Sequence, residues 1–173
     1  MRSERGYTLV EMLTVLVIFG TVMSALMALF VQGTNAEFDL NNRFQAQQGA
    51  RLALDKIRRE AHCASGVSVS SATSVTLTLP SFCPTGNGSV TWCTVSLGSS
   101  HYGLYRKTGA ACDSTGVRWA DYLTSGNAFS YAAQSTTSLA KLSVDFPVNV
   151  KPSRSVDTYE LKDDIVLRNS LRQ

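Results

Sequence analysis

One uninterrupted apolar run constrains this chain more than any other feature. From Met12 to Ala36 there are 25 consecutive uncharged residues, most of them Leu, Val, Ile, Met, Phe or Ala. A bilayer core of about 30 Å needs about 20 apolar helical residues, so the stretch from Tyr7 to Val31 is long enough to span it. The remainder is polar and rich in Ser and Thr. The sequence therefore predicts a membrane segment followed by a soluble segment.

The charges around the run predict its orientation. Arg2 and Arg5 precede it and only Glu4 opposes them, so the positive-inside tendency keeps the N-terminus cytoplasmic and exports the chain from Asn35 onward. An ordinary secretory signal would have an apolar region of about 7–15 residues that ends at a small-residue cleavage site. This run is longer and no Ala-x-Ala-like site ends it, which argues against that class of signal.

Two residues argue against a plain single-pass anchor. Glu11 is the fifth residue of the membrane-spanning stretch that starts at Tyr7, and such a carboxylate costs about 2.5–3.5 kcal/mol on insertion scales, so it usually marks function. Gly6 stands between the charged leader and the run. The stretch from Arg5 to Leu13 resembles the processing site of type IV prepilins and pseudopilins. That family has a short basic leader ending in Gly, an aromatic first mature residue, most often Phe but here Tyr7, and Glu at the fifth mature position.

The resemblance implies a processing and assembly pathway. A prepilin peptidase would cleave after Gly6, and the new amine on Tyr7 would be N-methylated. Glu11 would then pair with the terminal amine of an adjoining subunit in a filament. The implied partners are the prepilin peptidase, other minor pilins, a major pilin and an inner-membrane assembly platform protein. The protein would occupy the cytoplasmic membrane first and a cell-surface filament afterwards.

The apolar run passes into an amphipathic stretch. Three- and four-residue spacing places one set of residues on a single helix face. The members of that stripe are Leu40, Phe44, Gln47, Ala50, Leu54, Ile57 and Ala61. The charged side chains between them, which include Arg51 and Glu60, are interpreted as a solvated face. A near-continuous helix from Tyr7 to about Ala61 would run roughly 80 Å at 1.5 Å per residue. The expected organisation is a leader peptide at 1–6, a transmembrane helix at 7–34 and an amphipathic continuation of that helix at 35–62.

Residues 63–173 form the predicted exported domain. From Ala64 to Ser138, 26 of 75 residues are Ser or Thr, and short alternating runs replace the helical pattern. The predicted strands are Val67–Val69, Val75–Leu79, Val90–Leu97, Tyr102–Lys107, Leu139–Phe146 and Tyr159–Leu167. The expected fold class is α+β, a long N-terminal helix packed on a mainly antiparallel sheet, as in type IV pilins.

The four cysteines, Cys63, Cys83, Cys93 and Cys112, all lie on the exported side. An even count in an oxidising compartment favours two disulfides, and the spacings hold no Cys-x-x-Cys pair that would favour a metal. Three connectivities are open. A hairpin around residues 71–74 would place Ser68 near Leu77 and bring Cys63 close to Cys83. That argument favours Cys63–Cys83 together with Cys93–Cys112.

The sequence contains no arrangement typical of an active site. His62 and His101 have no metal-binding spacing, and there is no nucleophile motif. We therefore expect no enzyme activity, no catalytic residue, no metal and no cofactor. Five aromatic residues could form a binding patch, but aromatics in a small β domain more often belong to the core. They are Trp92, Tyr102, Tyr105, Trp119 and Tyr122.

Three scattered segments refine the resemblance. Residues 48–60, 104–106 and 166–169 resemble J-type minor pseudopilins and W-type minor pilins, which sit at or near a filament tip and help to initiate assembly. The alternatives are a tip-displayed binding subunit, either an adhesin or a DNA-uptake subunit, and an exported membrane-anchored enzyme. The chain is 44% hydrophobic and 17% charged, and this composition excludes a disordered chain. Its net charge of +3 is smaller than the basic excess of most nucleic-acid binders. Nucleic acid stays open as a partner. The type of filament, whether a pilus, a competence filament or a secretion filament, also stays open.

Overall fold

The structure is a computed structural model, and it describes residues 7–167. Its contacts divide the chain into two units, Met1–Asn41 and Asn42–Gln173. One helix, α1 (Leu9–Cys63), begins in the first unit and ends in the second. This confirms the long helix that the apolar run and the amphipathic stretch predict. The two units are described separately below.

The second unit contains a sheet that is antiparallel in every pairing. Its strands are β1 (Gly66–Ser71), β2 (Ser74–Leu79), β3 (Gly88–Gly98), β4 (His101–Thr108), β5 (Val117–Leu123), β6 (Phe129–Ala132), β7 (Lys141–Val148) and β8 (Tyr159–Val166). The order is β1-β2-β3-β4-β5-β7-β6, and β8 pairs with β7. A short 3₁₀ helix, η1 (Ser155–Asp157), precedes β8. The six predicted strands are present, and β5 and β6 were not predicted.

The sheet curls, so that its two ends approach each other. The Ala72 carbonyl, in the β1–β2 turn, accepts from the backbone N–H groups of Ala128 and Phe129 at 2.9 Å each. Thr94 Oγ1 of β3 donates to the Gly126 carbonyl at 2.6 Å. Strands of twisted sheets rotate relative to their neighbours, which allows this closure. The curled sheet therefore has a concave face that the helix can fill.

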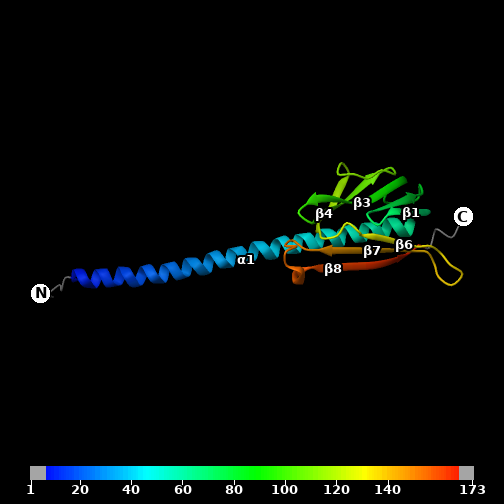
Figure 1. The fold of residues 1–173 in the computed structure, drawn as a ribbon. Coiled ribbons are helices and arrows are strands. Elements are labelled where there is room, and N and C mark those ends of the chain that lie inside the picture. Colours follow the sequence, from blue (N-terminus) through cyan, green and yellow to red (C-terminus); the bar gives the residue numbers. More distant parts are fainter. Residues whose placement is uncertain (1–6, 168–173) are drawn as a thin grey trace. The chain divides into compact units, whose positions relative to one another are not determined.

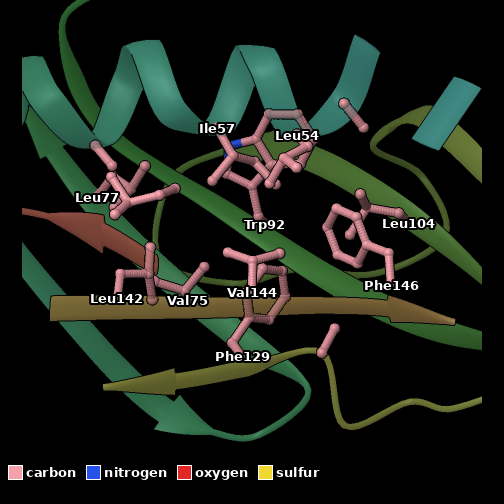
Figure 2. Packing of buried hydrophobic residues seen from close by; sticks show 14 of the residues in the cluster. Leu54, Ile57, Val75, Leu77, Trp92, Leu104, Phe129, Leu142, Val144 and Phe146 are labelled. Carbon is pink, nitrogen blue, oxygen red and sulfur yellow. The ribbon is translucent and has the colours of Figure 1, made fainter. Parts of the chain in front are cut away.

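The part of α1 that follows Asn42 lies across the sheet, with β3 and β4 on one side and β7 and β8 on the other (Figure 1). Leu54 and Ile57 point from the helix toward Trp92 of β3 (Figure 2). These three residues are buried. The α+β architecture expected from the sequence, a long helix packed on an antiparallel sheet as in type IV pilins, is thereby confirmed.

The predicted apolar stripe of the helix is correct only in its later half. Leu40 and Phe44 are 68% and 63% exposed, and the buried face begins instead at Ala46. It continues through Ala50 and Ala53, whose small side chains let the helix approach the sheet closely. The prediction failed at its start because the spacing of apolar residues indicates which face of a helix is apolar, but not where along the helix that face becomes buried.

Glu60 is the second correction, because it is fully buried and does not belong to a solvated face. Its Oε2 accepts from Trp92 Nε1 at 2.7 Å, and its Oε1 lies 3.0 Å from Arg106 Nε and 2.9 Å from Arg106 Nη2. Lys56 Nζ lies 3.7 Å from the same oxygen. A buried carboxylate is tolerated when it is paired and hydrogen-bonded, as here. Glu60 thus joins the end of α1 to both β3 and β4.

Three arginines of α1, spaced seven or eight residues apart, contact the C-terminal segment. The pairs are Arg43 with Asp157 at 2.8 Å, Arg51 with the Tyr159 hydroxyl at 2.9 Å, and Arg58 with Asp163 at 2.8 Å. This spacing returns to the same helix face every two turns. Arg43 therefore contacts η1, and Arg51 and Arg58 contact β8. The sequence placed Arg51 on the solvated face and did not predict this contact.

The cysteines form two pairs, Cys63 with Cys83 and Cys93 with Cys112. This is the connectivity that the hairpin argument favours. The hairpin itself differs by one residue, because Ser68 pairs with Thr76 rather than lying near Leu77. The first pair links the end of α1 to the loop after β2, and the second links β3 to the loop after β4.

Candidate functional site at the start of the helix

The first turn of α1 is closed by a pair of reciprocal hydrogen bonds. Thr8 immediately precedes the helix, and its backbone N–H and its Oγ1 donate to Glu11 Oε2 at 2.9 and 3.0 Å. In return, the Glu11 backbone N–H donates to Thr8 Oγ1 at 3.3 Å. This is a capping box, which satisfies backbone donors that have no partner within the helix. The carboxylate also lies at the positive end of the helix dipole.

The sequence Thr-x-x-Glu at positions 8–11 is the known signature of such a box. Sequence reasoning singled out Glu11 for its charge and missed Thr8 as its partner. The structure places Tyr7 just before this box, with 84% of the residue exposed. Gly6, the predicted cleavage residue, lies outside the described residues. Tyr7, Thr8 and Glu11 therefore form one local arrangement at the start of the helix.

The helix beyond Glu11 presents large apolar side chains to its surroundings. Val15, Ile18 and Phe30 are examples, and all are exposed. Within residues 7–167, α1 is the one helix long and apolar enough to cross a membrane, with a mean hydropathy of 2.4 over 18 residues. Apolar surface of this extent is unfavourable in water and favourable in hydrocarbon. The prepilin-like apolar helix thus has the properties of a membrane anchor.

Hydroxyl groups inside the apolar run are satisfied by the helix itself. The side chains of Thr14, Thr21 and Ser24 each donate to a carbonyl three residues earlier, at 2.8–2.9 Å. A polar group without a partner is costly in hydrocarbon, and this local bonding removes that cost. The serines and threonines of the run are therefore compatible with a bilayer.

Residues 1–27 match the family model described as the prokaryotic N-terminal methylation motif. The chain carries the methylation motif of prokaryotic type IV prepilin-like proteins. No curated protein and no solved structure matches it. The motif implies cleavage by a prepilin peptidase and assembly into pilus filaments, and it supports a type IV pilin-like subunit. Type IV pilins are structural subunits and not enzymes.

Two aspartates of the pilin-like second unit, Asp113 and Asp164, form ion pairs and hydrogen bonds at its surface. The Lys107 ammonium, followed by the Thr115 hydroxyl and backbone N–H, lowers the pKa of Asp113 to about 2. Hydrogen bonds from Ser143 and Lys141 lower the pKa of Asp164. Among residues 7–167, no group of three or more His, Cys, Asp or Glu side chains is arranged to hold a metal ion. Asp113 attaches the loop after β4 to Lys107 of β4, and Asp164 of β8 attaches that strand to Lys141 of β7.

Proposed function

We propose that the chain is a minor pilin or pseudopilin that initiates or caps a type IV pilus or type II secretion pseudopilus. The observation that carries the proposal is the methylation motif at residues 1–27, continuous with a helix that exposes its apolar side chains. The resemblance of residues 48–60 to J-type and W-type subunits supports a place at the filament tip. The second unit is then the exported part.

Processing comes first in this proposal. The prepilin peptidase cleaves after Gly6, and the new amine of Tyr7 is methylated. Thr8 follows Tyr7 directly, so the amine forms at the edge of the capping box. The positive leader keeps this end cytoplasmic before assembly. The α-amino group is largely protonated near neutral pH, which gives it a charge opposite to that of Glu11.

Assembly then exchanges the partner of Glu11. In the single chain its carboxylate accepts from Thr8, and these bonds hold it at the start of the helix. In a filament, staggered helices bring the amine of one subunit to the Glu11 carboxylate of the next. An ion pair within hydrocarbon offsets two burial penalties and fixes the axial register of the helices. A tip subunit uses Glu11 to receive one neighbour, since no subunit precedes it.

The test replaces Glu11 by Gln and by Val in cells that express the remaining pilins and the assembly platform. Cleavage and membrane insertion should be unchanged, because both variants make the segment less charged. Filament number and co-purified minor subunits should fall strongly in both, because the pairing charge is gone. Glu37→Gln, an acidic residue of α1 beyond the motif, is the matched control and should assemble as wild type. Wild-type filament numbers in both Glu11 variants would contradict the proposal.

A further inference from the structure

The loop between β7 and β8 presents an apolar side chain to its surroundings. Val156, in η1, is 95% exposed, more than any other large apolar residue that the structure describes. Isolated exposed apolar residues are common on protein surfaces, so the surroundings of Val156 decide whether it has a role. Three features of these surroundings are considered in turn: the order of the loop, the groups beside Val156, and the place where the loop contacts α1.

The loop is held in one conformation by Asn149, which is buried. The Asn149 amide nitrogen donates to the Arg154 carbonyl at 2.7 Å and to the Thr158 hydroxyl at 3.1 Å. Its Oδ1 accepts from the Lys151 backbone N–H at 2.7 Å. An ordered loop loses little conformational freedom when it binds. Val156 is therefore presented by a segment that is already organised.

Val156 also borders a hollow of about 400 Å³ whose other lining residues are polar. They include Ser153, Arg154 and Ser155. Among the residues that the structure describes, the Arg154 guanidinium has no ion-pair or hydrogen-bond partner, and neither serine hydroxyl is hydrogen-bonded. Guanidinium and hydroxyl groups donate to phosphate oxygens. The hollow thus offers unpaired donors for an anion directly beside an exposed apolar side chain.

The loop contacts α1 shortly after the apolar run. Asp157, which also lines the hollow, pairs with Arg43 at 2.8 Å. Arg43 follows the last residue of the uncharged run, Ala36, by seven residues, which is about 10 Å of helix. Asp163 of β8 pairs with Arg58, which comes later in α1. Along the helix, η1 is therefore the contact of the C-terminal segment that comes closest to the membrane anchor.

We propose that this loop docks on the membrane that holds the anchor, where the hollow binds the phosphate of an anionic phospholipid and Val156 packs against the start of the acyl chains. Lys151 and Arg154 make the loop cationic, because Arg43 neutralises Asp157. Anionic lipids attract such cations beside a membrane anchor. A transmembrane helix tilts by about 20° on average, which brings one side of an attached unit toward the bilayer.

This inference rests on the membrane anchor and concerns the chain before assembly. The experiment places single copies of the full chain in nanodiscs of dibrominated phosphatidylglycerol, whose bromines quench nearby tryptophans. Val156→Trp should lose a large share of the fluorescence that it adds to the wild type. The loss should be smaller in dibrominated phosphatidylcholine, which carries no net charge. Adding Arg154→Gln should lower the ratio of docked to undocked loop about fivefold, the effect of one basic residue near an anionic surface.

Two variants are matched controls. Val117→Trp tests position, since Val117 is 63% exposed but begins β5, whose other end shares a hollow with Asn42 of α1. Its tryptophan should not be quenched. Arg59→Gln tests charge, because it removes one exposed cation from a part of α1 that lies well beyond Arg43. Combined with Val156→Trp, it should leave the quenching unchanged.

An inserted chain in which Val156→Trp is quenched no more than Val117→Trp would overturn the proposal. Equal quenching with and without Arg154→Gln would also overturn it, since the headgroup would then not be bound. A blue shift of the Val156→Trp emission only in nanodiscs that hold several copies would assign the loop to a neighbouring subunit instead. A chain that does not enter nanodiscs would overturn the membrane anchor as well, so the two failures are distinguishable.

Discussion

The two units contain the same helix but use it in opposite ways. In the first unit the large apolar side chains are exposed, as Leu9 and Phe30 show, while in the second Trp92 and Phe146 are completely buried. The helix changes composition accordingly, from bulky Leu, Val and Phe to Ala at the positions that face the sheet. Burying a side chain of that bulky class is worth about 1.5–3 kcal/mol. The first unit can gain this only from a bilayer or neighbouring subunits, whereas the second gains it from its own fold.

The largest expected effect on stability concerns Glu60, whose buried contacts join α1 to the sheet of the second unit. Glu60→Ala leaves Arg106 without its buried anion and Trp92 Nε1 without an acceptor. We expect a loss of about 3–5 kcal/mol in unfolding free energy, the range for breaking a buried pair on one side. Denaturant unfolding measures it. Glu160→Ala, on the exposed β8 surface, is the control and should change stability little.

Glu60→Gln sharpens that result, because the amide keeps an acceptor for Trp92 but loses the charge that faces Arg106. Its destabilisation should lie between those of wild type and Glu60→Ala. Equal stability of wild type and Glu60→Ala would show that the buried pair does not hold the helix end to the sheet.

The disulfides should have the next largest effect. Replacing Cys63 and Cys83 together by Ser should cost about 3 kcal/mol, since the pair closes a loop of 20 residues. The same change at Cys93 and Cys112, a separation of 19, should cost a similar amount. Thermal unfolding of each double variant measures the loss, and thiol titration checks the pairing. Four titratable thiols in carefully prepared exported protein would rule out both bridges.

A smaller effect is expected where α1 contacts β8. Arg58 pairs with Asp163 at the partly exposed surface, so a double-mutant cycle with Arg58→Ala and Asp163→Ala should give a coupling of about 0.2–1 kcal/mol. The coupling should shrink at high salt because exposed pairs are screened. A coupling of several kcal/mol would mean that the arginine contacts, and not the core, dominate this face.

The smallest effect depends on pH. The folded pKa of Asp113, about 2, lies below its ordinary value of 3.8. The stabilisation that this carboxylate gives is therefore complete above pH 3.8 and is lost as the pH falls toward 2. The difference in melting temperature between wild type and Asp113→Asn should be constant above pH 3.8 and narrow below it. A difference that does not change over this range would contradict the Lys107 and Thr115 contacts.

Local patterns could be predicted from the sequence, whereas contacts between residues far apart in the chain could not. The apolar run, Glu11 and the strand alternation are local patterns, and they predict the helix and six strands. The capping box was also present in the sequence, since Thr8 lies three residues before Glu11. Glu60 could not be placed, because its partners Trp92 and Arg106 are 32 and 46 residues away.

Strands β5 and β6 escaped prediction for different reasons. The bulge at Asp121 and Tyr122 disrupts the alternation of β5, and Phe129–Ala132 is too short to show a period. The aromatic residues of the sheet were attributed to the core, which is correct for the buried Trp92 and incomplete for Tyr122, which is 39% exposed.

The central claim is that the first unit is processed and then paired with other subunits. Intact-mass spectrometry after co-expression with a prepilin peptidase tests it most directly. The account predicts loss of residues 1–6 and gain of one methyl group on Tyr7. It also predicts that Gly6→Leu stays uncleaved, because a cleft fitted to glycine has no room for a branched side chain. A wild-type chain that keeps its leader, or efficient cleavage of Gly6→Leu, would contradict the account.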